Sequence, residues 1–333
     1  MTLKRVVIVG GGVGGLATAL ALKESEYELF IVERDPPPPD ITPEQAFEQW
    51  PREGVPQFRH AHILLSRIQT NLRDHHPELL QQLMAAGLYL STVEEILPAS
   101  HYHGIVPEPG DDDLLHLWGR RATFEYVVRR YVERMPNVHF VHDTRVVGIV
   151  AEPLGRALML RGVELQARDD SRSQLLADIV VDASGVRSKF PEWLEARGVQ
   201  CEDESHASGF VYACRHYHLN DPADSPPREH GGGNYDYLGY ATFYAEHGHY
   251  ALTLACPEDE AELCDLIRRP EGFEALCDQL PVLRRWMRAS TATTKVLGSG
   301  KFQNRWRRFG VGEGGPPLAF FPVGDTQLQT NPM

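Results

Sequence analysis

The apolar pattern at the start of the chain predicts a strand, a turn and a helix. Residues 6–9 form an uninterrupted apolar run, as in a parallel-sheet strand that is buried on both faces. Glycines follow at positions 10, 12 and 15, and residues 16–23 then consist almost wholly of strong helix formers. A second apolar run, residues 29–32, ends in the acidic residue Glu33. This succession of strand, glycine turn, helix, strand and acid is typical of a dinucleotide-binding unit.

Each part of this unit has a physical task. Gly10 permits the tight turn, Gly12 lets the backbone approach a pyrophosphate, and Gly15 lets the helix pack close to the strand. The free amides and the positive dipole at the helix start favour phosphate charge. Glu33 stands where a carboxylate accepts hydrogen bonds from an adenosine ribose, and its charge disfavours a 2′-phosphate. The unit therefore predicts FAD or NAD in preference to NADP.

Helical and strand-like patterns alternate in the chain that follows. Residues 41–58 are polar and predict an irregular segment. Helical spacing covers residues 59–74, 78–86, 121–132 and 258–288, the last interrupted by Pro270 and Pro281. Strand-like runs cover residues 138–141, 146–150 and 177–182, while residues 158–160 and 163–165 suggest a hairpin.

From about residue 201 to residue 255 the pattern changes to aromatic, strand-like stretches separated by proline and glycine. This change predicts an antiparallel sheet. The predicted fold class is therefore α/β, with a Rossmann-like parallel-sheet domain and an inserted antiparallel-sheet domain. We assign residues 1–75, 115–195 and 298–333 to a discontinuous cofactor-binding domain, and residues 76–114 and 196–297 to a substrate domain.

Composition narrows the class of protein. The chain has 333 residues, of which 42% are hydrophobic, enough for a large globular core. Its net charge of −13 argues against a nucleic-acid partner, because binding phosphates needs a basic surface. No apolar run reaches the length of a membrane span, and the N-terminal run lacks the pattern of a signal peptide. Five cysteines without close spacing predict reduced thiols and a cytoplasmic location.

Four motifs between residues 6 and 332 resemble those of the class A flavoprotein monooxygenases, the para-hydroxybenzoate hydroxylase type. The first is the glycine turn with Glu33, and the second is a helix that starts at Arg121. The third is Asp182-Ala-Ser-Gly-Val-Arg-Ser. The fourth is Phe-Pro-Val-Gly-Asp325, with Asn-Pro332 beyond it. The resemblance therefore extends over nearly the whole chain.

This resemblance implies a set of contacts to FAD. Gly10, Gly12, Gly15 and Glu33 would hold its adenosine and pyrophosphate end. Further contacts there would come from Arg34 and from the Val146 backbone near the adenine. Arg121 would approach the cofactor, Asp325 would bind the ribityl chain, and Pro332 would approach the flavin ring.

The resemblance also implies a reaction. NADH or NADPH would reduce the FAD, and oxygen would then give a flavin C4a-hydroperoxide that hydroxylates or epoxidises an apolar or aromatic small molecule. No side chain is assigned as acid, base or nucleophile. The alternatives are a flavin dehydrogenase or reductase of the same fold, and a non-catalytic FAD-binding remnant. A halogenase is disfavoured because the chain has no Trp-x-Trp-x-Ile-Pro motif.

The sequence departs from the family pattern at two places. Ser184 stands where the third motif of the family usually has aspartate. The chain also stops at Met333, before the glycine-rich turn and helix that face the flavin in the family. We therefore expect a truncated member of the family, either a fragment or a natural remnant.

Residues 210–217 read as one strand that could meet the substrate. Because side chains alternate along a strand, Tyr212 and Arg215 lie on opposite faces. Arg215 is a candidate for orienting an acidic or phenolic substrate, and Tyr212 is the candidate on the other face. The pattern alone leaves both faces open.

Two further patterns are interpreted as structural. Gly310-x-Gly312-x-x-Gly315 repeats the glycine spacing but follows a basic run and precedes two prolines, so it predicts a loop. Four His-x-His pairs, at 60/62, 101/103, 216/218 and 247/249, have no acidic or cysteine partner at a consistent spacing. We therefore predict no metal site. A site role stays open for His60 and His62, since related proteins pass near the flavin in this region.

Overall fold

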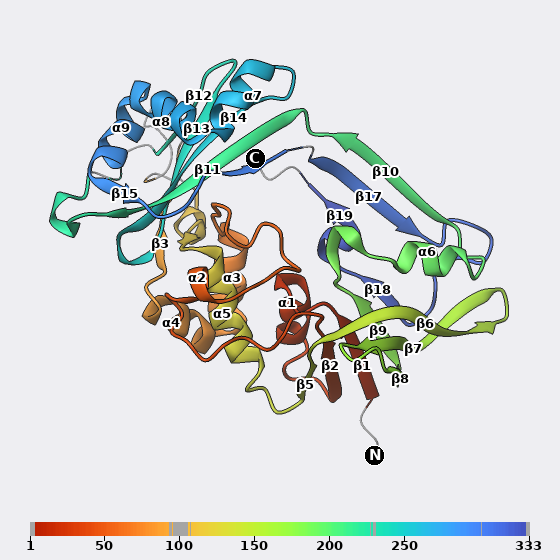
Figure 1. Cartoon of the computed structure of the whole chain (residues 1–333). Helices are drawn as coiled ribbons and strands as arrows, with labels where there is room; N and C mark the ends of the chain where they lie inside the picture. Colours follow the sequence, from red (N-terminus) through yellow and green to blue (C-terminus); the bar gives the residue numbers. More distant parts are fainter. Residues whose placement is uncertain are drawn as a thin grey trace.

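A parallel sheet of five strands carries the N-terminal unit in the computed structural model of the chain (Figure 1). The structure describes residues 4–92, 95, 106, 108–226, 228, 231–300 and 302–330. The strand order is β18 (Phe320–Pro322), β9 (Ile179–Asp182), β1 (Lys4–Val9), β2 (Tyr27–Val32) and β5 (Val138–Val141), and all neighbours are parallel. Helix α1 (Val13–Ala21) connects β1 to β2, as predicted from the apolar and glycine pattern.

The central strand β1 is apolar throughout because both of its faces are covered. Val6 and Ile8 pack in one core cluster with α1 and with α5 (Arg121–Val132). Val7 and Val9 pack in another cluster on the opposite face. That face is covered by a three-stranded antiparallel sheet, β6 (Thr144–Leu154), β7 (Ala157–Ala167) and β8 (Arg172–Leu176), and by α6 (Phe190–Glu195).

A six-stranded antiparallel sheet forms the second part of the fold. Its strands are β12 (Gly232–Asn234), β13 (Gly239–Tyr244), β14 (His249–Pro257), β11 (Phe210–Leu219) and β15 (Ser290–Ala292), with β16 (Leu297–Ser299) also paired to β11. Helices α7 (Ala261–Arg268), α8 (Pro270–Gln279) and α9 (Pro281–Arg288) pack on one face of this sheet. Pro270 and Pro281 each begin a helix, as the predicted interruptions require.

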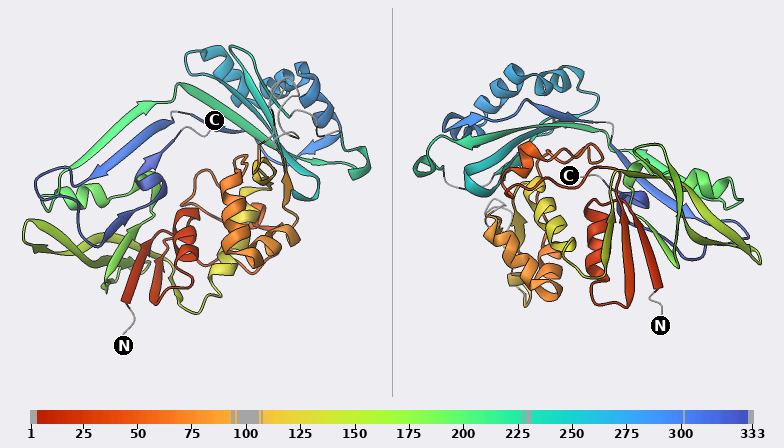
Figure 2. Two further views of the ribbon diagram at one scale, coloured as in Figure 1. Left: turned by 180° about the vertical axis from the view of Figure 1, so that it is seen from behind. Right: turned by 60° about the horizontal axis from the view of Figure 1, so that its bottom comes forward.

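A long antiparallel ribbon connects the parallel sheet and the six-stranded antiparallel sheet. Strands β10 (Cys201–Ala207) and β17 (Gln303–Phe309) pair antiparallel, and β19 (Leu328–Gln329) pairs with β17. Figure 2 shows this ribbon running from the antiparallel sheet toward the parallel sheet in both views. The predicted α/β fold class, with a parallel and a separate antiparallel sheet, is confirmed.

The segment between β2 and α5 is mainly helical. It contains α2 (Ala46–Gln49), α3 (Ser66–His75), α4 (Pro77–Ala85) and the small ribbon of β3 (Tyr89–Ser91) and β4 (His116–Trp118). Leu79 and Leu83 of α4 pack in the same core cluster as β1, although this helix falls in the range assigned to the substrate domain. The division into domains stays a prediction.

Two local predictions were wrong. A helix from residue 59 was expected, but α3 starts at Ser66, because Leu64 instead exchanges backbone hydrogen bonds with Leu117. Residues 158–165 do not form a hairpin of their own. They lie within the single strand β7, whose Gly162 takes a φ of 149° that few other residues adopt. Within the described residues, no helix is long and apolar enough to cross a membrane.

Candidate functional site

Three glycines in the turn after β1 have different structural roles. Gly10 has a φ of 104°, and a Cβ atom placed on it would lie 2.6 Å from the carbonyl oxygen of Ala183. A Cβ on Gly15 would lie 1.9 Å from the carbonyl oxygen of Gly10, so only glycine lets α1 pack this close to the turn. A Cβ on Gly12 would meet no atom within 4 Å. Gly12 therefore faces open space at the start of α1, which leaves room for a ligand phosphate.

Glu33 lies buried at the end of β2, directly beside this turn. Its carboxylate accepts hydrogen bonds from the backbone amides of Gly11, at 3.1 Å, and Asp35, at 3.0 Å. Burial alone would raise the pKa of Glu33, but the Arg52 guanidinium and the hydrogen bond from the Asp35 amide bring the pKa below its ordinary value. Glu33 is therefore charged at neutral pH and held in one orientation.

The ion-pair partner of Glu33 is Arg52, a residue that was not predicted from the sequence. Its side chain is 2% exposed and pairs with three carboxylates, those of Glu33 at 3.0 Å, Asp35 at 2.9 Å and Glu125 at 3.0 Å. It comes from the segment 41–58 that was predicted to be irregular. No local signal distinguishes Arg52 from a surface arginine, since its partners stand 17, 19 and 73 residues away.

The second and fourth motifs meet at the other end of the site. Arg121, in the first turn of α5, donates to Nε2 of His62 at 3.1 Å, and its Nε lies 3.5 Å from Glu125. Asp325 lies in the turn Gly324–Thr326 after β18. Partial desolvation raises the pKa of Asp325, and the positive charge of Arg121 opposes this rise. Arg121 and Asp325 are therefore close enough to interact, although 204 residues separate them in the sequence.

His62 is neutral in this arrangement. Its burial and the charge of Arg121 lower its pKa to about 4. Its Nδ1 lies 2.8 Å from the carbonyl oxygen of His60, so Nδ1 carries the proton and Nε2 accepts from Arg121. The sequence left a site role for His62 open. The geometry supports one, because His62 orients the Arg121 guanidinium.

The third motif holds the fourth beside the glycine turn. Asp182, fully buried, accepts hydrogen bonds from the amide and hydroxyl of Ser184 and from the hydroxyl of Ser188. Thr326 accepts a hydrogen bond from the Gly185 amide at 2.9 Å, and Val323 donates to the Asp182 carbonyl. The serine at position 184 therefore forms part of the internal bonding of the motif.

The remaining predicted cofactor contacts lie near these groups or outside the described chain. Arg34 directly follows Glu33, and 45% of its side chain is exposed. Val146 lies at the start of β6, where the register of the β6–β7 ladder shifts, and the nearby Thr144 amide donates to the Glu33 carbonyl. Pro332 lies outside the residues that the structure describes. The assignment of all these residues to FAD stays a prediction.

The two substrate candidates lie on opposite faces of β11, as the strand period predicts. The Tyr212 ring lies 5.5 Å from the His60 ring and stacks on Phe302 at 5.2 Å. Arg215 points to the helix-covered face, where it donates to the carbonyl of Thr294 at 2.9 Å and pairs with Glu274 of α8. Their substrate roles stay predictions, and the placement favours Tyr212, since only its face turns toward His60 and His62.

A buried ion pair fastens the antiparallel sheet to α5. Arg120, just before α5, donates its backbone amide and its Nε to Glu246, which lies between β13 and β14. The Thr123 hydroxyl donates to the same carboxylate. Burial would raise the pKa of Glu246, but the charge of Arg120 lowers it, so the pair is ionised. This contact, also missed from the sequence, positions the sheet over the Arg121 end of the site.

The chain also forms an aromatic pocket of about 230 Å³. It is enclosed by the β3–β4 ribbon and by β12 and β13. Ile63 and Trp118, which line it, are close in the chain to His62 and Arg121. The lining of the pocket therefore includes the segments that carry His62 and Arg121, although neither of these two side chains lines it.

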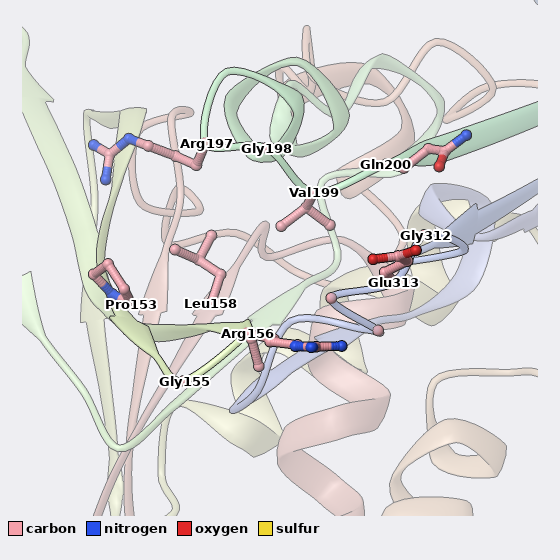
Figure 3. A pocket seen from close by; sticks show the side chains of 13 residues that line it. Pro153, Gly155, Arg156, Leu158, Arg197, Gly198, Val199, Gln200, Gly312 and Glu313 are labelled. Carbon is pink, nitrogen blue, oxygen red and sulfur yellow. The ribbon is translucent and has the colours of Figure 1, made fainter.

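The second glycine pattern lines a different pocket, of about 350 Å³, at the molecular surface (Figure 3). Residues 310–315 form a loop between β17 and β18, and no helix follows it, as predicted. A Cβ on Gly312 would lie 2.9 Å from the Gln200 side chain, so the glycine serves close packing. Arg156, Arg197 and Glu313 are exposed at this pocket. Nothing in this geometry resembles a strand–turn–helix unit.

The histidine pairs do not assemble a metal site in the part of the chain that the structure describes. There, no group of three or more histidine, cysteine, aspartate or glutamate side chains could hold a metal ion. His216 is buried and bonds to the carbonyl of Arg59, while the His218 ring packs on His249 at 4.6 Å. His101 and His103 lie outside the described residues.

Comparison with known proteins agrees with this geometry. Residues 5–208 match a family model described as FAD binding domain. The chain is 26% identical to Protein Rv3254 of Mycobacterium tuberculosis over 362 residues, which covers 98% of this chain and 68% of that protein. The family match confirms the predicted resemblance to FAD-dependent flavoproteins and, in the choice between FAD and NAD, supports FAD.

Solved structures show the same fold at low sequence identity. The myxobacterial chondrochloren halogenase CndH, described as a FAD-dependent halogenase, matches with a TM-score of 0.67 and 16% identity, covering 100% of this chain and 70% of that one. PqsL from Pseudomonas aeruginosa, described as a probable FAD-dependent monooxygenase, matches with a TM-score of 0.65 and 15% identity. That match covers 99% of this chain and 80% of PqsL. At such identities the likeness concerns the fold alone.

Proposed function

Because this chain belongs to the FAD binding domain family, we propose that it is a FAD-dependent monooxygenase that takes electrons from NADH or NADPH. Its substrate in this proposal is an aromatic or other apolar small molecule, which it hydroxylates or epoxidises. One observation carries the proposal: an aromatic pocket is lined by Ile63 and Trp118, which belong to the same segments of the chain as His62 and Arg121. A molecule bound among Ile63 and Trp118 would be close to His62 and Arg121.

The residues at the glycine turn suit the adenosine and pyrophosphate end of FAD. The open space at Gly12 and the amides at the start of α1 would receive the pyrophosphate. Glu33 would accept hydrogen bonds from the ribose. An ionised carboxylate has about four acceptor positions, and Gly11, Asp35 and Arg52 occupy three of them. One position therefore remains for a ribose hydroxyl.

The residues at the opposite end suit the ribityl chain and the flavin. Asp325 would accept hydrogen bonds from ribityl hydroxyls, and Arg121 and Pro332 would make the further contacts that the resemblance implies at this end. Arg34 and the Val146 backbone would make theirs at the adenosine end. Arg121 fits this role because its buried Nε makes no hydrogen bond within the described part of the chain. His62 keeps the guanidinium in position by accepting from Nη1.

Bound FAD would supply the redox chemistry, passing electrons from the nicotinamide to molecular oxygen. The chain's own contribution is orientation and exclusion of water. Trp118, Tyr89, Phe243 and Tyr244 surround the pocket with apolar rings, which favours a planar apolar substrate and keeps water away from the reacting atoms.

The test is a labelled-oxygen experiment on the FAD-loaded chain. The protein should be yellow, lose its flavin absorbance with NADH or NADPH under nitrogen, and regain it in air. With ¹⁸O₂ and a panel of small aromatic compounds, one ¹⁸O atom should enter a product, as mass spectrometry would show. Oxidised product without label would overturn the monooxygenase and favour a dehydrogenase or reductase. A colourless protein that cannot be reconstituted with FAD would favour a non-catalytic remnant.

A further inference from the structure

Two buried cysteines meet at the corner between β14 and α7. The Sγ atom of Cys256 lies 3.4 Å from that of Cys264, and the two residues are 8 positions apart in the chain. Their exposed fractions are 2% and 6%. All five cysteines lie within the described residues, and all of them carry free thiols. Among these five, two sulfur atoms are in hydrogen-bond contact only at this pair.

The local fold directs both sulfur atoms into the same space. Cys256 lies near the end of β14, where its register partner on β11 is Val211. Cys256, Val211 and Cys264 belong to one core cluster, on the face of the sheet that α7 covers. The Cys264 thiol donates to the carbonyl oxygen of Pro257 at 3.3 Å, which holds its side chain at the corner beside Cys256.

The separation of the two sulfur atoms suits a cross-link. A disulfide bond is about 2.05 Å long, so the atoms must approach each other by about 1.4 Å from their present 3.4 Å. Shared between the two side chains, this is ~0.7 Å per sulfur atom, which small rotations about the Cα–Cβ bonds provide. The chain already turns back between β14 and α7, so the backbone need not change its path.

Burial limits how the pair can be oxidised. Burial and the contact with Cys264 raise the pKa of Cys256 to about 12, so this thiol stays protonated at neutral pH. Protonated, buried thiols react slowly with oxidants, and large reagents do not reach them. A small oxidant such as hydrogen peroxide can enter where larger ones cannot. The pair should therefore resist brief exposure to peroxide and become oxidised during sustained exposure.

We propose that Cys256 and Cys264 form a reversible disulfide under sustained exposure to hydrogen peroxide, and that this disulfide fastens α7 to the end of β14. One sulfur atom attacks peroxide: an S–O bond forms, the O–O bond breaks, and one water molecule leaves. The other sulfur atom then attacks the resulting sulfenic acid: the S–S bond forms, the S–O bond breaks, and a second water molecule leaves. Two thiols thus pass two electrons to one peroxide. A dithiol such as dithiothreitol restores both thiols by exchange.

The test counts free thiols after peroxide treatment of the full chain. The chain is reduced, freed of reductant and exposed to hydrogen peroxide. Catalase then removes the peroxide, and the chain is unfolded with N-ethylmaleimide, which labels every remaining thiol. Mass spectrometry should show three labels in place of five, because the disulfide consumes two thiols. Cleavage after Glu258, Glu260 and Glu262 should leave Cys256 and Cys264 in one linked product, which dithiothreitol separates.

Two variants identify the pair. Cys256→Ser should give no linked product, whereas Cys277→Ser should still give it and fall from four labels to two. Cys277 is the matched control, because it is buried in the same core cluster. Five labels after prolonged exposure, or a disulfide that joins any other cysteines, would overturn the proposal, as would a fall to two labels in Cys256→Ser. The linked product of the unaltered chain decides the pairing even if a variant does not fold.

A second measurement tests whether the disulfide fastens the corner. A cross-link restricts the unfolded chain, so the urea midpoint of unfolding should be higher for the oxidised chain than for the reduced chain. Dithiothreitol should reverse this shift, and peroxide should leave the midpoint of Cys256→Ser unchanged. Equal midpoints for the oxidised and reduced chain would overturn the fastening of α7 to β14.

Discussion

The two ends of the candidate cofactor site are built differently. At the adenosine end, Glu33 is buried, ionised and bonded on three sides by Gly11, Asp35 and Arg52. At the flavin end, Asp325 is exposed and the buried Nε of Arg121 makes no hydrogen bond in the described part of the chain. The adenosine end is thus organised before any ligand binds. The flavin end keeps groups that a ligand could engage.

The arginines at the two ends also have different partners. At the adenosine end, one buried arginine, Arg52, pairs with the three carboxylates of Glu33, Asp35 and Glu125. At the flavin end, Arg121 has a neutral histidine, His62, as its hydrogen-bond partner and lies 3.5 Å from the Glu125 carboxylate. Glu125 touches both arginines, so the two ends share one carboxylate. Four changes separate the ends experimentally.

The largest effect is expected from Arg52→Met at the adenosine end. Removing Arg52 leaves Glu33, Asp35 and Glu125 buried without their cation, which should lower the free energy of unfolding by about 3–5 kcal/mol. Urea unfolding of the FAD-free protein measures the change. The control is Arg73→Met, whose ion pairs are exposed and should contribute at most about 1 kcal/mol. Equal effects of the two substitutions would show that the buried cluster is not a stabilising unit.

Gly12→Val should separate cofactor binding from folding. A valine side chain would enter the open space at the turn, so the fold should persist while FAD affinity falls by about 100-fold or more. Flavin fluorescence titration measures the affinity. Gly14→Ala, whose added Cβ would make only an ordinary 3.9 Å contact with Ala183, should bind FAD as before. Unchanged affinity in Gly12→Val would place the pyrophosphate elsewhere.

Arg121→Met tests the flavin end by the same titration. Loss of one charged contact to the cofactor should weaken FAD binding by about tenfold, with a smaller effect on folding than Arg52→Met because Arg121 is only partly buried. Arg130→Met, on the same helix but paired at the surface with Glu133, is the control. A destabilisation as large as that of Arg52→Met, with FAD affinity unchanged, would assign Arg121 a structural role instead.

The smallest effect concerns pH and His62. Its pKa falls from 6.5 to about 4 on folding, so the unfolded chain binds more protons between these values and stability is lost as pH falls through this window. His62→Gln keeps an acceptor for Arg121 and should reduce this loss by about 1 kcal/mol between pH 6.5 and 5. Urea unfolding at both pH values measures it, with the exposed His75→Gln as control. An unchanged loss in His62→Gln would mean that His62 is accessible to protons in the folded chain.

Glu33 provides the contrasting case at the adenosine end. Its pKa is below 4.5 in the folded chain, so its contribution to stability is complete above that value and is lost only as pH falls further. The flavin end should therefore respond to mild acid and the adenosine end only to stronger acid. This ordering follows from the opposite charge types of the two buried groups.

Much of the fold could be read from the sequence, since local chemistry imposes it. The apolar run of β1 requires burial on both faces, and the spacing of Gly10, Gly12 and Gly15 suits a single kind of turn. The limits of α5, residues 121–132, were predicted correctly because its apolar spacing is regular. The FAD family was likewise evident from motifs that are local in the chain.

Tertiary structure alone decided which distant side chains meet. Arg52 is the centre of a buried charge cluster, because in the folded chain its segment packs against the end of β2 and against Glu125 of α5. The pairing of Leu64 with Leu117 replaced a helix and brought His62 to Arg121. The faces of β11 were known to alternate, but only packing against α8 settled that Arg215 turns away from the site. Local pattern determines the elements, whereas partners far apart in the sequence depend on how the elements pack.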